Sequence, residues 1–273
     1  MITPIRHGDV AVVTLNRPPA NFVDTEYLDE IATAVESASE ARAIVLASDG
    51  KHFCAGAALG GSANKPAHDP AHDSARDSAR DSAPEPARHP ARSADGRHIY
   101  DVAIRLFEQP VPMVAAVQGS AVGAGLGLAL AADFRVATPA TRFLANFALL
   151  GFHHGFGLTE TLPRVVGPQR ATEMFTTARP VLGPEALGIG LCDRLVEPDR
   201  LLDEALGLAA SIAGCAPLAV ASIRATMRAG LADRVRAAMA RERAEQDRLM
   251  RTADFAEGVA AVRERRTPAF EAR

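Results

Sequence analysis

The chain has 273 residues, of which 48% are hydrophobic and 5% are aromatic, with no Trp. This length and apolar content suffice for one large core or two modest domains, which excludes a peptide-like or wholly disordered protein. The 30 basic and 33 acidic residues give a net charge of -3. Because aromatic surface is scarce and positive charge is not in excess, we expect no nucleic-acid partner.

Cysteine usage and the N-terminus predict the compartment. Cys54, Cys192 and Cys215 are odd in number, far apart and without a CxxC pair, which is typical of a reducing compartment. The first ten residues lack an apolar run followed by a small-residue cleavage site, so no signal peptide is expected. We therefore expect a cytoplasmic protein.

The longest apolar stretch, residues 111–132, is interrupted by Gln118, Ser120 and several glycines. A membrane-spanning helix needs about 20 consecutive, predominantly apolar residues. The stretch therefore predicts a buried strand followed by a buried helix, and no membrane span.

The first elements in chain order predict a parallel sheet. Residues 10–15 (VAVVTL) and 43–47 (AIVLA) are β-branched or apolar runs that end at turn residues, as buried strands do. Between them, residues 24–39 carry apolar side chains at helical spacing after an acidic first turn. A strand, helix, strand order is typical of a parallel sheet covered by helices.

Residues 62–97 differ from the rest of the chain in composition. They contain six acidic and six basic residues, two successive copies of Asp-Ser-Ala-Arg, and no large apolar side chain. Such a segment can bury almost nothing to offset the entropy of ordering, so it predicts a disordered insertion.

Two histidines in this segment, His68 and His72, stand near regularly spaced aspartates and are conceivable metal ligands. Arg76 and Arg80 lie beside those carboxylates and oppose a cation. We expect no metal site.

The remaining elements follow the same rules. Residues 98–107 have helical spacing, and residues 113–117 and 134–137 are predicted strands. Beyond Leu158 the predicted helices are 171–178, 185–188, 199–213, 218–229 and 233–251.

The last predicted helix is rich in Arg but also holds Glu242, Glu245 and Asp247. This mixture of signs favours a solvated or subunit-bridging face over a nucleic-acid site.

Two glycine-containing turns stand out, at residues 51–59 after one predicted strand and at residues 118–127 after another. Small residues let a backbone approach a ligand closely, and free N–H groups at a helix start favour negative charge. Two such turns facing one another would form an oxyanion hole.

Other interpretations of the second turn are weaker. Gly123, Gly125 and Gly127 are spaced GxGxG, and no ribose-binding acid occurs in residues 145–150, so we expect no dinucleotide cofactor. Ser120 does not lie in a GxSxG nucleophile elbow and is interpreted as a turn residue.

The order of these motifs resembles the enoyl-CoA hydratase/isomerase (crotonase) family. The matching segments are 16–18 (NRP), 53–57 (FCAGA), 115–125 (AAVQGSAVGAG), 149–151 (LLG), 159–167 (TETLPRVVG) and 186–196 (ALGIGLCDRLV). The resemblance covers nearly the whole chain outside the insertion. It implies an α/β spiral of ββα units in residues 1–196 and a helical C-terminal trimerisation region in residues 197–273.

The resemblance also implies an acyl-CoA substrate and a set of site residues. The backbone N–H groups of Ala57 and Ala124 would form the oxyanion hole for the thioester carbonyl. Ala124 stands where the family usually has Gly, and Ala58 replaces a frequent Asp. The implied substrate-binding residues are Ala55, Ala58, Leu59, Gly60, Gly123 and Phe147.

The acid and base residues depart from the family pattern. The two glutamates of family hydratases fall here on Gly127 and Phe147, and neither residue can hold or release a proton. Plain hydration is therefore not expected, and isomerase, decarboxylase or thioester hydrolase chemistry is favoured.

Histidines near the second lost glutamate are the remaining candidates. His154, and after it His153, could act as a general acid or base, or could only cap the next helix or bind backbone carbonyls. Fainter candidates are His98, Tyr100 and Asp101, whereas Glu160 is expected to be structural and Cys54 a small buried hydrophobe.

We therefore expect an acyl-CoA-processing enzyme that forms a homotrimer or a dimer of trimers. CoA would enter as part of the substrate, with no permanently bound cofactor and no metal. The alternative, which rests on the same missing glutamates, is a catalytically silent acyl-CoA-binding or assembly protein of the same fold.

Overall fold

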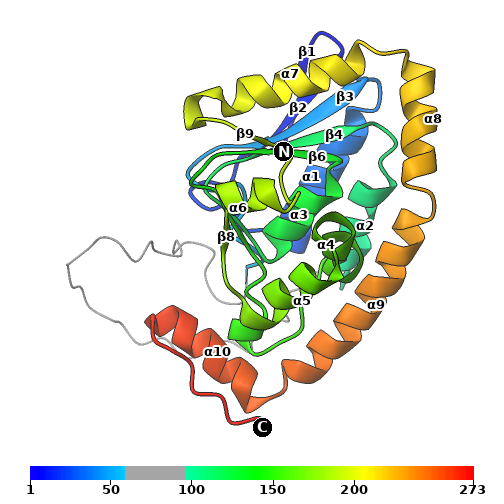
Figure 1. The fold of residues 1–273 in the computed structure, drawn as a ribbon. Coiled ribbons are helices and arrows are strands. Elements are labelled where there is room, and N and C mark those ends of the chain that lie inside the picture. Colours follow the sequence, from blue (N-terminus) through cyan, green and yellow to red (C-terminus); the bar gives the residue numbers. More distant parts are fainter. Residues whose placement is uncertain (59–95) are drawn as a thin grey trace.

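The computed structural model describes residues 1–58 and 96–273 (Figure 1). The strands are β1 (Ile5–His7), β2 (Val10–Leu15), β3 (Ala43–Ser48), β4 (Met113–Val117), β5 (Ser120–Val122), β6 (Phe134–Ala137), β7 (Arg142–Leu144), β8 (Val181–Leu182) and β9 (Arg194–Leu195). Within the described residues they form a six-stranded sheet, ordered β1-β2-β3-β4-β6-β9, and a three-stranded sheet, ordered β5-β7-β8.

The helices surround these sheets. They are α1 (Thr25–Ser37), α2 (Ile99–Glu108), α3 (Ala124–Ala131), α4 (Leu158–Val166), α5 (Pro168–Thr177), α6 (Gly183–Gly188), α7 (Leu201–Ala213), α8 (Pro217–Met227), α9 (Leu231–Leu249) and α10 (Ala253–Glu264). Two short 3-10 turns, η1 (Ala148–Leu150) and η2 (Pro198–Arg200), complete the list.

The predicted strands are confirmed as the centre of the large sheet. β2, β3, β4 and β6 are parallel neighbours, with Val12 opposite Val45 and Val45 opposite Val114. Alternate side chains of β2 enter different cores: Val10 and Val12 pack on the α7 side, and Ala11, Val13 and Leu15 enter the main core. Burial on both faces explains why β2, β3 and β4 are almost wholly apolar, without regular polar alternation.

The chain crosses repeatedly from one sheet to the other before entering a helix. After β4 in the large sheet come β5 in the small sheet and then α3, and β6, β7 and η1 repeat this order. This mixed α/β architecture with C-terminal helices confirms the predicted crotonase-like fold class. The two- and three-residue strands of the small sheet are too short to give a sequence signal.

The C-terminal helices are arranged in two ways (Figure 1). α7 lies across one face of the large sheet, where Ala205 and Ala209 are fully buried. α8 and α9 run down one side of the molecule, and α10 lies at the end far from α7. The sequence predicted α7, α8 and α9 but missed α4, which contains Pro163, and α10, which contains Gly258.

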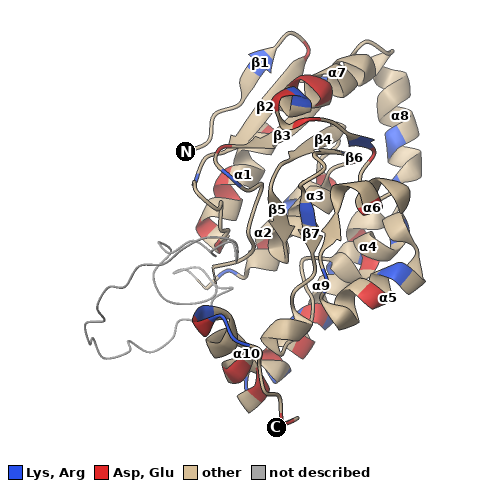
Figure 2. Cartoon of the chain, turned by 60° about the vertical axis from the view of Figure 1, so that its left-hand side comes forward, with Lys and Arg blue, Asp and Glu red and all other residues tan. Residues whose placement is uncertain are grey.

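The prediction of a solvated or subunit-bridging face on the Arg-rich helix was wrong for Glu242. Ion pairs join Arg241 and Arg248 to Glu245 on α9, and Figure 2 shows charges of both signs along α9 and α10. Glu242, however, is fully buried, and Gln246 on the same face is buried as well. Both side chains point into the molecule because the loop before α4 offers them hydrogen-bond partners.

Some predictions lie outside the described residues. These are Leu59, Gly60, His68, His72 and the proposed insertion 62–97 apart from its last two residues. Among the described residues, no single helix has both the length and the apolarity to cross a membrane. The segments Pro198–Ala213 and Pro217–Met227 satisfy these two criteria only as a pair bent by 105°.

Two helical glycines provide a matched test of how the fold is built. A Cβ added at Gly125 in α3 would overlap the carbonyl oxygen of Cys54, whereas one added at Gly207 in α7 meets nothing within 4 Å. We expect Gly125→Ala to lower the free energy of unfolding by about 3 kcal/mol. Gly207→Ala should raise it by about 0.5–1 kcal/mol, because alanine loses less backbone entropy in a helix. Urea denaturation would measure both, and a Gly125→Ala protein as stable as the parent would contradict the close packing.

Candidate active site

The two glycine-containing turns lie side by side. The N–H of Cys54 donates to Ser120 O (3.1 Å), and the N–H of Val122 donates to Cys54 O (3.0 Å). Cys54 and Ala121 thereby form a parallel bridge that attaches the first turn to the edge of β5. Segments nearly 70 residues apart in sequence are thus held at strand spacing.

The other edge of the first turn pairs with the segment before α1. The N–H of Val23 donates to Gly56 O (2.9 Å), and the N–H of Ala58 donates to Val23 O (3.0 Å). In such a parallel bridge the residue between the two bonded neighbours directs its own N–H to the opposite side. The N–H of Ala57 therefore points away from Val23, toward the side on which β5 and α3 lie.

Ala124 opens the helix that follows β5. Its position as the first residue of α3, after Gly123, leaves its N–H without an acceptor inside the helix. Gly123 has φ +53° and Gly56 has φ +112°, and both angles lie in the region that favours glycine. The backbone thus turns sharply at both points, and two N–H groups at the turns are available for a ligand oxygen.

Position 127 in α3, where the resemblance predicts the loss of a glutamate, is closed by packing. A Cβ added at Gly127 would lie 2.5 Å from Cδ1 and 2.7 Å from Cβ of Phe156. Phe156 is 1% exposed. No side chain fits at position 127 while Phe156 occupies this place.

Phe147, where the resemblance predicts the loss of a second glutamate, is apolar and lies beside the turn at Gly123. A Cβ added at Gly123 would lie 3.5 Å from Cζ of Phe147, whose ring also contacts Phe152 at a centroid distance of 5.4 Å. Phe152 in turn contacts Phe255 of α10 at 5.2 Å. The same added Cβ would lie 3.3 Å from Oδ1 of Asn146, a polar group beside this turn that the sequence prediction missed.

The two histidines lie on the loop between η1 and α4. His154 stacks on Phe175 of α5 (centroids 3.8 Å apart), and its Nε2 lies 2.9 Å from Thr159 Oγ1. Burial, and next the neighbouring His153, lower the pKa of His154 to about 3, so its ring is neutral near pH 7. His153 Nδ1 lies 2.7 Å from His154 O, so the interpretation of a histidine bound to a backbone carbonyl is confirmed for this residue.

None of the contacts found in residues 1–58 and 96–273 joins either histidine to Ala57 or Ala124. The histidines instead lie beside a buried polar network formed by Glu242, Gln246 and Tyr100. Glu242 accepts hydrogen bonds from the loop and from α4, and Gln246 donates to His153 O (2.8 Å) while accepting from the Tyr100 hydroxyl (2.8 Å). Sequence reasoning missed this network, because it depends on pairs of residues more than 80 positions apart.

The fainter candidates have structural roles. His98 and Asp101 form a capping box at the start of α2, and Glu160 pairs with Arg234 at 2.8 Å. Cys54 is fully buried, and burial raises its pKa to about 12, which confirms the small buried hydrophobe. Tyr100 is buried in the network described above, and burial raises its pKa well above the usual value.

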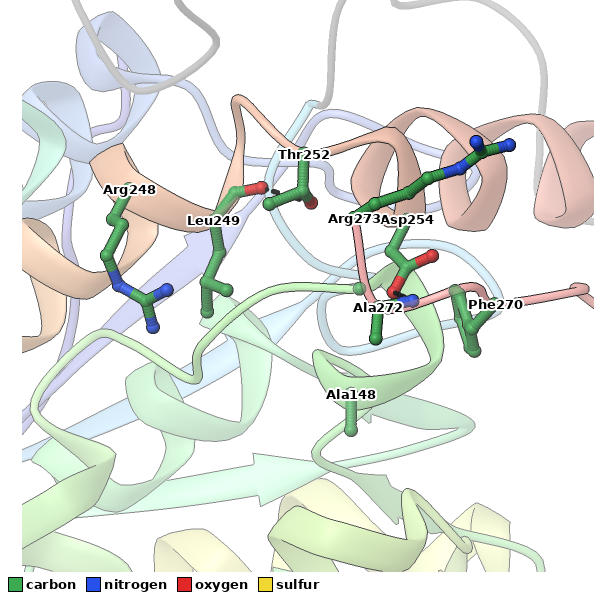
Figure 3. Close-up of a pocket in the computed structure, with 9 residues that line it drawn as sticks. Ala148, Arg248, Leu249, Thr252, Asp254, Phe270, Ala272 and Arg273 are labelled. Carbon is green, nitrogen blue, oxygen red and sulfur yellow. Dashed lines mark hydrogen bonds between the residues drawn. The ribbon is translucent and has the colours of Figure 1, made fainter.

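A cavity of about 340 Å³ lies elsewhere, between η1, the end of α9 and the C-terminal segment (Figure 3). None of the predicted site residues lines it. Asp254 at its edge accepts the N–H groups of Glu271 (2.7 Å) and Ala272 (2.9 Å), so this carboxylate is occupied by the chain itself. Over the described part of the chain, no cluster of three His, Cys, Asp or Glu residues suits a metal ion.

The mixed α/β fold and the two adjacent glycine turns are those expected of a crotonase-like protein. Comparison with known families identifies the family. The family model for enoyl-CoA hydratase/isomerase matches residues 6–81 and 88–273. The chain belongs to the enoyl-CoA hydratase/isomerase (crotonase) family, whose enzymes act on CoA thioesters.

Individual relatives and a solved structure support the same family assignment. The chain is 33% identical over 266 residues to crotonyl-CoA hydratase of Syntrophomonas wolfei, covering 96% of this chain and 94% of that protein. It is 30% identical over 270 residues to short-chain-enoyl-CoA hydratase of Clostridium acetobutylicum, with 96% and 94% coverage. The crystal structure of an enoyl-CoA hydratase/isomerase from Pseudoalteromonas atlantica superposes with a TM-score of 0.80 at 28% identity, covering 99% of each chain.

The low pKa of His154 makes a prediction about stability. An unfolded chain has an ordinary histidine pKa near 6.5 and binds a proton below it, whereas folded His154, with a pKa of about 3, does not. This contribution to stability is therefore present above pH 6.5 and is lost as the pH falls toward 3. When the pH falls from 7 to 5, the free energy of unfolding should decrease by about 1 kcal/mol more in the parent protein than in His154→Gln. This figure allows for the partial exposure of the His154 ring. Parallel pH curves in urea denaturation would contradict the neutral, buried ring.

Proposed function

We propose that the chain is an acyl-CoA enzyme that stabilises a thioester enolate between the backbone N–H groups of Ala57 and Ala124. The observation that carries this proposal is the attachment of the first turn to β5 through Cys54 and Ala121, with the glycine backbone of Gly125 against Cys54 O. Negative charge that develops on the thioester oxygen is stabilised by donors fixed in advance, worth roughly 3–4 kcal/mol for one well-placed donor. Ala55, Ala58, Leu59, Gly60 and Gly123 are proposed to contact the rest of the acyl-CoA.

We propose chemistry other than hydration. Hydration requires groups that activate a water and deliver a proton to the α-carbon. The family's two glutamate positions correspond here to Gly127, which is packed against Phe156, and to the apolar Phe147. Isomerisation, decarboxylation or thioester hydrolysis remains compatible with an enolate-stabilising site that lacks this carboxylate pair.

His154 is the proposed proton carrier, with His153 as the second candidate. A ring with a pKa of about 3 is neutral near pH 7, so one of its two nitrogens can accept a proton. It can accept a proton from the substrate or a water, and the resulting imidazolium is strongly acidic and returns the proton readily. An isomerisation would use both halves of this cycle, with the proton removed at one carbon and delivered at another.

A panel of CoA thioesters tests this proposal. The panel should include saturated, 2-enoyl, 3-enoyl and malonyl-type acyl groups, with products identified by mass spectrometry. We expect at least one thioester to be converted and crotonyl-CoA hydration to be absent. Efficient hydration would contradict the chemistry that we propose.

The converted thioester then tests the oxyanion hole. Ala124→Pro removes one N–H at the first position of a helix, where proline is well tolerated. It should lower kcat by about 10²–10³-fold. Ala124→Gly keeps the N–H and serves as the matched control, which should stay near the parent rate. Equal rates for the two variants would contradict a role for this N–H.

A silent acyl-CoA-binding protein is the second candidate, favoured by the same packing at Gly127 and Phe147. Calorimetric titration with the same panel distinguishes the two candidates. Binding of several thioesters without conversion of any would favour the silent protein, and one converted thioester would exclude it.

We also propose that the chain assembles as a homotrimer or a dimer of trimers through its C-terminal helices. α8 supports this proposal, because none of its residues is buried and Leu218, Ile223 and Met227 are 86%, 64% and 65% exposed. Single apolar side chains on a surface are ordinary, but three on one exposed helix suggest an interface.

Light scattering coupled to size exclusion would measure the assembly. A Leu218→Ser/Ile223→Ser protein should shift from a trimer or hexamer mass toward the monomer mass, because the contact loses its apolar area. Leu182→Ser, at a 48% exposed position outside α8, is the control and should leave the mass unchanged. A monomeric parent protein would contradict the assembly.

A further inference from the structure

The loop that carries the two histidines is held by a buried carboxylate of α9. Oε2 of Glu242 accepts the N–H of Gly157 at 2.8 Å, and Oε1 accepts the N–H of Thr159 at 2.9 Å. An amide N–H can only donate, so both carboxylate oxygens serve as acceptors. Burial raises the pKa of Glu242, and the hydrogen bonds from Thr159 and Gly157 oppose that rise by stabilising the ionised form.

The hydroxyl of Thr159 connects this carboxylate to His154. It donates its single proton to Glu242 Oε1 at 2.7 Å, the third hydrogen bond that the carboxylate accepts. It must therefore act as the acceptor in its 2.9 Å contact with His154 Nε2. The proton of the neutral His154 ring is fixed on Nε2, which leaves Nδ1 as the unprotonated nitrogen.

The neighbouring histidine has the opposite arrangement. His153 Nδ1 lies 2.7 Å from the carbonyl oxygen of His154, and a carbonyl can only accept. In the neutral ring the proton of His153 is therefore on Nδ1. The centroids of the two histidine rings lie 4.1 Å apart at an interplanar angle of 29°, and His154 also stacks on Phe175 at an interplanar angle of 6°. Stacking sets the plane of the His154 ring, and Thr159 sets its rotation within that plane.

We infer that Glu242 and Thr159 are positioning residues that fix His154 as the Nε2–H tautomer and present Nδ1 as its proton acceptor. This inference rests on the proposed function only where it assigns His154 a proton to carry. The tautomer itself follows from the donor and acceptor count of three hydrogen bonds. We call the two consecutive hydrogen bonds from His154 to Thr159 and from Thr159 to Glu242 the relay. Because Glu242 lies on α9 and Thr159 on α4, the relay also connects the histidine loop to the C-terminal helices.

Nitrogen-15 NMR of the full chain with labelled histidine tests the relay without any assay of activity. His153→Gln and His154→Gln assign the two resonances. We expect His154 to be solely the Nε2–H tautomer, with a slowly exchanging Nε2 proton, and His153 to be the Nδ1–H tautomer. A parent protein with the proton of His154 on Nδ1 would overturn the inference.

Thr159→Val and Thr159→Ser form the matched pair of variants. Valine keeps the shape of threonine but removes the acceptor oxygen, so the Nε2 proton of His154 should exchange rapidly. Serine keeps the hydroxyl oxygen, so in Thr159→Ser this proton should still exchange slowly. A protected proton that persists in Thr159→Val would also overturn the relay.

Turnover of a converted thioester separates the relay from the proposed function. Thr159→Val should lower kcat at least about tenfold with KM within about twofold, and Thr159→Ser should restore it, as expected for a misoriented base. Where His154→Gln lowers kcat, equal kcat in the parent, Thr159→Val and Thr159→Ser would overturn the positioning role. If the NMR results are as expected but His154→Gln turns over like the parent, the positioning of the ring stands and the proposed proton carrier fails.

Discussion

The candidate site depends on the close approach of two backbone segments, residues 53–57 and the turn from β5 into α3. Cys54 is bonded to β5 through both its N–H and its carbonyl oxygen, and that oxygen also lies against the backbone of Gly125. No side chain fits between the two segments at that point. The approach fixes two outward-facing N–H groups in advance, which is the condition under which backbone donors stabilise a developing charge strongly. The scarcity of aromatic residues, 5% of the chain, agrees with a core that relies on small side chains at its contacts.

This constraint explains which parts of the fold can be predicted from the sequence. β2 and β4 are buried on both faces, so each is an almost wholly apolar run with the boundaries that composition predicts. The small sheet is different, because β5 and β8 have only three and two residues and form through pairing with distant strands. The order of glycine motifs predicts that the two turns exist. Their close approach depends on tertiary contacts such as the bridge from Cys54 to Ala121, which the sequence does not reveal.

The polar part of the site could be predicted only incompletely, for a related reason. His153 and His154 are visible in the sequence as titratable residues beside a glycine turn. Glu242 looked like one more charge on an Arg-rich helix, because helical periodicity does not reveal which face meets a loop 85 residues away. Its burial is compatible with a charge because two amides and a hydroxyl donate to it. Partners of this kind are set by tertiary packing, and a single sequence carries no local signal for them.

The same loop connects the packing of Gly127 to the histidines. Phe156, which fills the place beside Gly127, is two residues from His154 and one residue from Gly157, whose N–H donates to Glu242. A carboxylate at position 127 would require Phe156 to move, and the loop that Glu242 holds would have to move with it. The packing of Gly127 and the orientation of His154 are therefore features of one structural unit. On the proposal that His154 carries the proton, the absence of a side chain at position 127 and the fixed neutral histidine both depend on how this loop packs between α3 and α9.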